Sequence, residues 1–214
     1  MKRREFSLTL AAGGLALTAG GAARAQGAPV EGQQYIRLSQ PAPVSLEAGK
    51  KVEVVEFFWY ECPHCNAFEP LLEAWVAKLP ADVAFHRVPV GFTARHQIAQ
   101  KAFYALEETG MLETMHARVF AAIHVQGKRL LSEKAYADFI AANGGDAAKF
   151  SDAFRSFSVN TKANRARQLA EAYKIDGVPA VGIQGRFYTS ATLAGGHAGT
   201  LRVTDYLIDQ VRKS

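Results

Sequence analysis

The chain of 214 residues is poor in cysteine, with only two, and it lacks internal repeats, low-complexity tracts and any dense run of lysine and arginine. Without a basic run there is little electrostatic reason to expect binding to nucleic acids or to membrane surfaces. Hydrophobic residues make up 49% of the sequence. A chain of this length and composition can bury enough apolar surface to fold as one globular domain without a metal or disulfide staple.

The first 25 residues lack a continuous apolar run of membrane-spanning length, because four glycines interrupt them. They contain instead the three parts of an export signal: basic residues at 2–4, a modestly apolar centre at 6–17 and small residues before a cleavage site. We expect cleavage after Ala25 and export from the cytoplasm. Arg3 and Arg4 leave the twin-arginine route open beside ordinary secretion. Cleavage lowers the net charge from +5 to +2.

A strand, a helix and a second strand are predicted between residues 50 and 92. Residues 50–60 and 82–92 are dense in β-branched and aromatic residues over strand length. Between them, apolar residues recur at steps of three and four, which is typical of a helix. Pro63 stands where the first helical turn would begin, and Pro70 is expected to kink the helix.

Residues 95–157 show helical periodicity and almost no strand signal. One apolar stripe in this block joins Phe150, Phe154 and Phe157, and we expect it in the core. A further helix is predicted over 160–173, followed by two short strands around Gly185 and a C-terminal helix. We therefore divide the mature chain into 26–94, a helical insertion at 95–158, and 159–214.

The two cysteines are separated by two residues, in the stretch Cys62-Pro63-His64-Cys65. A structural zinc site needs four ligands and would have to recruit histidines from distant segments. Covalent haem attachment needs histidine directly after the second cysteine, where this chain has Asn66. A structural disulfide across so short a gap would constrain the unfolded chain little. Redox chemistry between the two thiols explains the spacing best.

The position of the pair at a helix start assigns different roles to the two sulfurs. Cys62 precedes the first turn, where backbone N–H groups, the helix dipole and His64 favour its thiolate. We therefore predict that Cys62 is the sulfur that attacks and is attacked. Cys65, one turn further on, is predicted to be the resolving thiol.

The stretches "EFFWYECPHCNAFEP" and "GVPAVGIQGRFY", with the helical block between them, resemble DsbA-type periplasmic thiol:disulfide oxidoreductases. The resemblance implies an α/β thioredoxin fold, with a central mixed sheet flanked by helices and an inserted helical domain. It also implies a periplasmic monomer that needs no cofactor beyond the Cys62–Cys65 disulfide. Its partners would be unfolded or newly exported proteins that contain cysteine, and a membrane reoxidant of the DsbB type.

The same resemblance carries functional positions over to this chain. Val178 and Pro179 match the family's cis-proline loop beside the active-site disulfide. Glu56 matches its buried acid and Glu69 a second acid near the site. Glu61 departs from the commonest pattern, in which an aromatic residue precedes the nucleophile, and its charge is expected to oppose a thiolate on Cys62. The active-site motif itself matches at Cys62, Pro63, His64 and Cys65.

Two alternatives stay open on the sequence. One is a thiol reductase or disulfide isomerase of the same fold, although the short arm before the first long strand leaves no room for an isomerase's usual dimerisation domain. The other is a metal-binding or chaperone-like module that uses the two cysteines and an exposed apolar groove. The remaining histidines are expected to be surface or packing residues: His86, His96, His116, His124 and His197.

Overall fold

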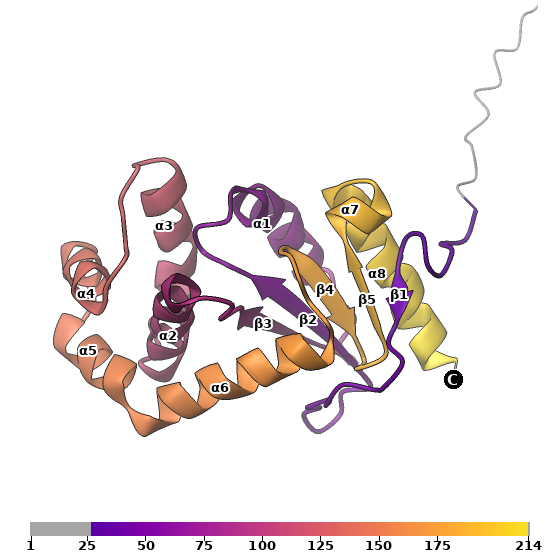
Figure 1. Cartoon of the computed structure of the whole chain (residues 1–214), viewed down its shortest axis with the longest axis horizontal. Helices are drawn as coiled ribbons and strands as arrows, with labels where there is room; N and C mark the ends of the chain where they lie inside the picture. The colour runs from indigo at the N-terminus through magenta and orange to yellow at the C-terminus, as the bar shows by residue number, and fades with distance from the viewer. Residues whose placement is uncertain (1–26, 214) are drawn as a thin grey trace, which may run out of the picture.

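A five-stranded mixed sheet forms the centre of the molecule in the computed structural model, which describes residues 27–213 (Figure 1). The strands lie in the order β1-β5-β4-β2-β3, and β2 and β3 are parallel whereas the other neighbours are antiparallel. The predicted export signal, with its cleavage site at Ala25, lies outside the described residues. The strands are β1 (Ile36–Arg37), β2 (Val52–Phe58), β3 (Val83–Pro89), β4 (Ala180–Ile183) and β5 (Phe187–Ser190).

The strand β2 is the centre of the sheet, and all seven of its residues are buried. Its sequence, Val-Glu-Val-Val-Glu-Phe-Phe, is nearly continuous in apolar residues because helices cover both faces of the sheet. In its register with β3, Glu56 lies opposite Arg87, so that two charged residues share the interior. The strand leads directly into the loop that holds the first cysteine.

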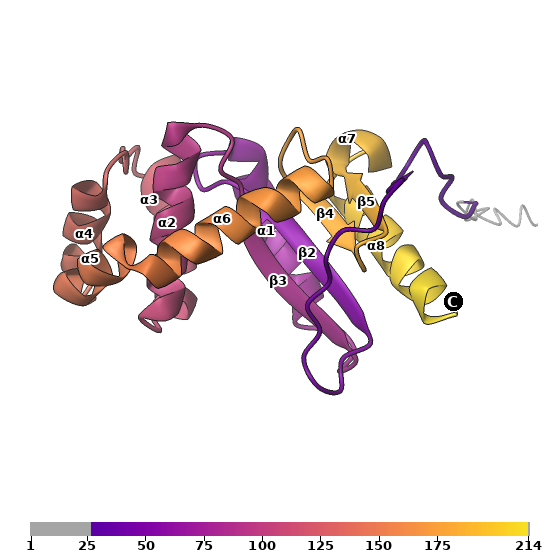
Figure 2. The same cartoon turned by 60° about the horizontal axis from the view of Figure 1, so that its bottom comes forward.

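Helices cover both faces of the sheet (Figures 1 and 2). On one face lie α1 (Pro63–Val76) and α8 (His197–Arg212), and on the other lies α6 (Phe157–Ala172). A short helix, α7 (Ala191–Ala194), precedes α8. Pro70 lies inside α1, which continues as one helix on both sides of it. The arrangement is the predicted thioredoxin fold.

Four helices form a block beside β3: α2 (Ala94–Glu108), α3 (Leu112–His124), α4 (Glu133–Ala142) and α5 (Ala147–Arg155) (Figure 1). The expectation that Phe157 shares a buried stripe with Phe150 and Phe154 is wrong, because Phe157 is 88% exposed. Ser156 is extended and accepts a hydrogen bond from the Val159 N–H, so it ends α5 and caps α6. Phe157 therefore begins a new helix with a new direction, and the predicted start at 160 lies three residues too late.

Candidate functional site

Cys62 is the N-cap residue of α1, and Pro63 is its first helical residue. The Cys62 N–H donates to the Trp59 carbonyl oxygen at 3.1 Å, which closes a tight turn between β2 and the helix. Cys62 is only 7% exposed and Cys65 is fully buried, and both are free thiols. The strand and helix thus hold two sulfurs one helical turn apart at the edge of the core.

The two thiols have opposite acidities. A hydrogen bond from the Cys65 thiol is the main cause that lowers the pKa of Cys62, to about 6. The N–H groups of Cys65 and His64 and the charge of His64 lower it as well, whereas burial acts in the opposite direction. Burial raises the pKa of Cys65 far above its usual value, and the neighbouring Cys62 sulfur raises it further. Around neutral pH, Cys62 is therefore mainly a thiolate and Cys65 a thiol.

The loop before β4 lies against the first cysteine. The Val178-Pro179 peptide bond is cis, as predicted, and the Cys62 sulfur lies 3.4 Å from the Val178 carbonyl oxygen, to which the protonated form of the thiol donates. A cleft of about 580 Å³ opens beside this loop. It is lined by His64 from α1, by residues 175–180, by the end of β5 and the start of α7, and by His197. The ring of His197 stacks on Phe68.

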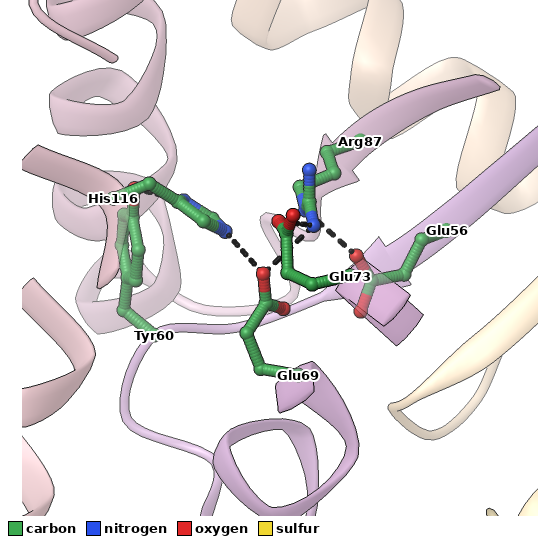
Figure 3. A network of polar contacts seen from close by, with 6 residues as sticks. All are labelled: Glu56, Tyr60, Glu69, Glu73, Arg87 and His116. Carbon is green, nitrogen blue, oxygen red and sulfur yellow. Dashed lines mark hydrogen bonds and ion pairs between the residues drawn. The ribbon is translucent and has the colours of Figure 1, made fainter. Parts of the chain in front are cut away.

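A largely buried network of charged residues joins β2, α1 and β3 (Figure 3). Arg87 on β3 reaches Glu56 at 3.3 Å, Glu69 at 2.7 Å and Glu73 at 2.5 Å. Glu56 is fully buried and Glu69 is 7% exposed, whereas the Glu73 side chain is mostly exposed. Both predicted acids are therefore present, joined by an arginine that the sequence analysis did not single out.

The two buried acids titrate in opposite directions. Burial raises the pKa of Glu56 to about 8, and the negative charge of Glu69 raises it further. Burial also opposes the ionisation of Glu69, but contacts with His116 and the charge of Arg87 leave the pKa of Glu69 below its usual value. At pH 7, Glu56 is thus mainly protonated and Glu69 is ionised.

The network continues through His116, which is 7% exposed, to Tyr60. The His116 Nε2 lies 3.2 Å from Glu69, and its Nδ1 lies 2.8 Å from the Tyr60 hydroxyl (Figure 3). An ionised Glu69 can only accept a hydrogen bond, so we place the imidazole proton on Nε2. The Tyr60 O–H then donates to Nδ1. His116 packs in the core, as expected for a packing residue, but its contact with Glu69 was not foreseen.

Side chains of the helical block also hold the residues directly before Cys62. His124, at the end of α3, lies with its Nε2 2.8 Å from the Tyr60 carbonyl oxygen. The ring of His96 on α2 lies 4.1 Å from the ring of Trp59. Arg95, also on α2, forms an ion pair with Glu61. No local pattern around residues 95–124 signals these contacts, because they depend on how the block packs against the loop.

A thiolate at a helix start, a buried partner thiol and an adjacent cis-proline loop define a dithiol–disulfide oxidoreductase of the thioredoxin fold. Within residues 27–213, no group of three or more His, Cys, Asp or Glu side chains is arranged to hold a metal ion. None of the helices in the described part of the chain has both the length and the apolar character needed to cross a membrane.

Comparison with known proteins identifies the family. The model of the DSBA-like thioredoxin domain matches residues 77–197. The chain is 43% identical to the thiol:disulfide interchange protein DsbA of Burkholderia cepacia, over 99% of this chain and 98% of that protein. It is 44% identical to DsbA of Bordetella parapertussis over the whole of both. The crystal structure of Pseudomonas aeruginosa DsbA superposes with a TM-score of 0.82 at 42% identity, covering 86% of this chain and 95% of that one.

The chain therefore belongs to the DsbA family of thiol:disulfide oxidoreductases. The fold and the chemistry of dithiol oxidation agree with this assignment. The redox-active group of the family is its own disulfide.

Proposed function

We propose that the chain oxidises pairs of thiols in other proteins by donating the Cys62–Cys65 disulfide through a mixed disulfide on Cys62. The observation that supports this proposal is the contrast between the two thiols. Cys62 has a pKa of about 6, whereas the buried Cys65 has a raised pKa. A sulfur with a low pKa leaves readily from a disulfide, so the mixed disulfide on Cys62 resolves towards oxidised substrate.

Two exchange steps complete the reaction. A substrate thiolate first attacks the Cys62 sulfur, the Cys62–Cys65 bond breaks, and Cys65 departs and takes up a proton. The second substrate thiolate then attacks the substrate sulfur of the mixed disulfide, and Cys62 leaves as a thiolate. The substrate gains a disulfide and loses two electrons, which reduce the protein to its dithiol.

Glu56 is the proposed source of the proton for Cys65. It is fully buried and mainly protonated at neutral pH, and when it is ionised its charge raises the pKa of the Cys65 thiol. Burial and the negative charge of Glu69 favour the protonated form of Glu56, and together they outweigh Arg87, which favours the carboxylate. Glu69 is thus assigned an electrostatic role and Glu56 the proton transfer.

The loop at Val178 and Pro179 is the proposed docking site for substrate. It contacts the Cys62 sulfur through the Val178 carbonyl and forms one wall of the cleft of about 580 Å³. An extended segment could pair with the Val178 backbone beside the reacting sulfur. Because backbone pairing reads no side chains, we infer broad specificity for cysteine-containing chains.

Membership of the family supports a proposal for the setting of this reaction. DsbA relatives are periplasmic proteins. We propose that this chain is exported with cleavage after Ala25, acts as a monomer on newly exported proteins, and is reoxidised by a membrane partner of the DsbB type. We also propose that the helical insertion spans residues 95–158.

Direct assay separates the oxidase from the alternatives. The oxidised protein should convert a dithiol peptide to its disulfide in stoichiometric amounts, and Cys62→Ser should abolish this reaction. A reductase would instead reduce insulin rapidly in the presence of a thiol donor, and its own disulfide would resist reduction by glutathione. A binding module would show no reaction that depends on Cys62.

A further inference from the structure

Glu61 places a carboxylate directly before the nucleophile, and the tertiary structure gives it a partner. The Arg95 guanidinium donates to the Glu61 carboxylate through Nε at 2.9 Å and through a second, shorter contact from its terminal nitrogen. The Glu61 side chain is only 9% exposed, whereas that of Arg95 is 55% exposed. A nearly buried carboxylate is therefore paired with a cation that reaches it from the solvent side.

The positive charge of Arg95 does not stabilise its own helix, α2. It is the second residue of α2, where the helix dipole disfavours a positive charge, and the first turn contains no acidic residue. The Glu61 carboxylate provides the negative charge at this helix start from outside the helix. The guanidinium also lies over the ring of Trp59, 5.8 Å from its centroid. Arg95 thus contacts two of the three residues that precede Cys62.

The backbone of this segment is held independently of Arg95. The Tyr60 side chain contacts His116 and its carbonyl contacts His124, while the Trp59 ring lies against His96. These contacts fix where Glu61 stands relative to Cys62. The charge of Glu61 can therefore be altered without releasing the loop.

We propose that Arg95 is a positioning residue of the redox site, which holds and neutralises the Glu61 carboxylate so that the helical block sets the electrostatic environment of Cys62. This inference rests on the proposed role of Cys62 as the nucleophile. It assigns to the helical block a part in the chemistry of the thiol as well as in packing.

Other ionisable groups that interact with Glu61 do not replace this charge. His96 on α2 has a pKa lowered first by burial, so it is mainly neutral at pH 7. Tyr136 on α4 has a pKa raised by burial and then by Glu61, and it is neutral as well. Arg95 keeps its charge at every pH of interest. On the side of the nucleophile, His64 acts on Cys62 directly.

A double-mutant cycle on the Cys62 thiolate tests the proposal. The pKa is measured from the ultraviolet absorbance of the thiolate in wild type, Arg95→Ala, Glu61→Gln and the double variant. We expect Arg95→Ala to raise the pKa by roughly 0.5, which is about threefold less thiolate below the pKa, as is typical of a partly exposed ion pair. Glu61→Gln should lower it, and the double variant should return close to wild type.

The same change should appear in the equilibrium with glutathione, where a threefold shift towards the disulfide corresponds to about 15 mV. If Arg95 is only a packing residue, the double variant will keep the full effect of Arg95→Ala, and the proposal is overturned. It is likewise overturned if Arg95→Ala leaves the Cys62 pKa unchanged.

Two controls keep the outcomes distinct. Arg155→Ala removes another arginine of the helical block, one that pairs with Glu133 rather than with the active-site loop, and should leave the thiolate titration unchanged. If wild type itself shows no thiol with a depressed pKa, the proposed role of Cys62 fails. If wild type shows it and the Arg95 variants do not alter it, only the inference about Arg95 fails.

Discussion

The Tyr60 hydroxyl lies 2.8 Å from Nδ1 of His116, and both residues are buried. This contact joins the loop before the nucleophile to helix α3 of the inserted block. It also fixes the imidazole so that its Nε2 faces Glu69. The electrostatics around the buried thiol therefore depend on a side chain from each of the two parts of the fold.

Tyr60→Phe should leave the His116 nitrogen without its donor in the core. We expect the free energy of unfolding to fall by about 1–3 kcal/mol, seen as a loss of a few degrees in melting temperature. Tyr136→Phe is the matched control, because the Tyr136 hydroxyl is buried without a hydrogen-bond partner in the described structure. That variant should be as stable as wild type or more so. Equal losses in both would contradict the assigned hydrogen bond.

The order of the cysteines can be read from trapped intermediates. With Cys65→Ala, the mixed disulfide on Cys62 has no internal thiol to resolve it, so adducts with substrate proteins should accumulate on non-reducing gels. Cys62→Ala should form few adducts, because the remaining sulfur of Cys65 is fully buried and has a raised pKa. Adducts that appear mainly with Cys62→Ala would reverse the assigned roles.

The stability of the reduced form should depend on pH through Cys62. Its folded pKa, about 6, lies below the value of about 8.5 for an unfolded cysteine. Such a group stabilises the fold fully above the unfolded pKa and loses that effect as pH falls through 6. Between these values the reduced form should gain about 1.4 kcal/mol per pH unit over the oxidised form.

At pH 8 this gain should exceed the roughly 2 kcal/mol that closing so short a loop gives to the oxidised form, so the reduced protein should melt higher. At pH 5 the order should reverse. Calorimetry of both forms across this range provides the measurement. A difference in melting temperature that does not vary with pH would show that the Cys62 thiolate contributes nothing to stability.

Glu56→Gln should stabilise the protein at pH 7. Because the pKa of Glu56 is raised to about 8, the buried carboxyl costs stability at every pH above its unfolded value, and the cost grows until pH 8. We expect a gain on the order of 2 kcal/mol after the loss of the Arg87 contact. Glu69→Gln should have the opposite sign, since the pKa of Glu69 is lowered and its ionised form pairs with Arg87. Chemical denaturation at pH 5 and pH 7 measures both.

The same Glu56→Gln protein should be a slower oxidase despite its stability. Cys65 leaves as a thiolate in a buried site, and glutamine has no proton to transfer to it. Stopped-flow oxidation of a dithiol peptide should slow by roughly tenfold or more, with the formation of mixed disulfide limiting. An unchanged rate would show that Glu56 does not supply the proton and that the Cys62–Cys65 pair reacts without it.

The sequence alone was sufficient to predict the order of the main strands and helices, to indicate the fold class through a family resemblance, and to single out Cys62 and Cys65 as the candidate reacting pair. These features are encoded locally: Pro63 starts a helix, β-branched and aromatic residues mark β2, and the spacing of Cys62 and Cys65 brings the sulfurs together at a helix start. The Gly-Val-Pro stretch likewise marked the loop at Val178. The one stripe that misled, ending at Phe157, failed because Ser156 interrupts the helix and redirects it.

Only the tertiary structure decided the environment of those sulfurs. Arg95 and His116 lie 34 and 56 residues along the chain from their partners Glu61 and Tyr60, and Arg87 meets Glu56 through the register of β2 and β3. Such pairings depend on packing angles and strand register, which no local pattern specifies. A carboxylate that the sequence places beside the nucleophile as an opposing charge is therefore held, in the folded protein, by a cation from another part of the fold.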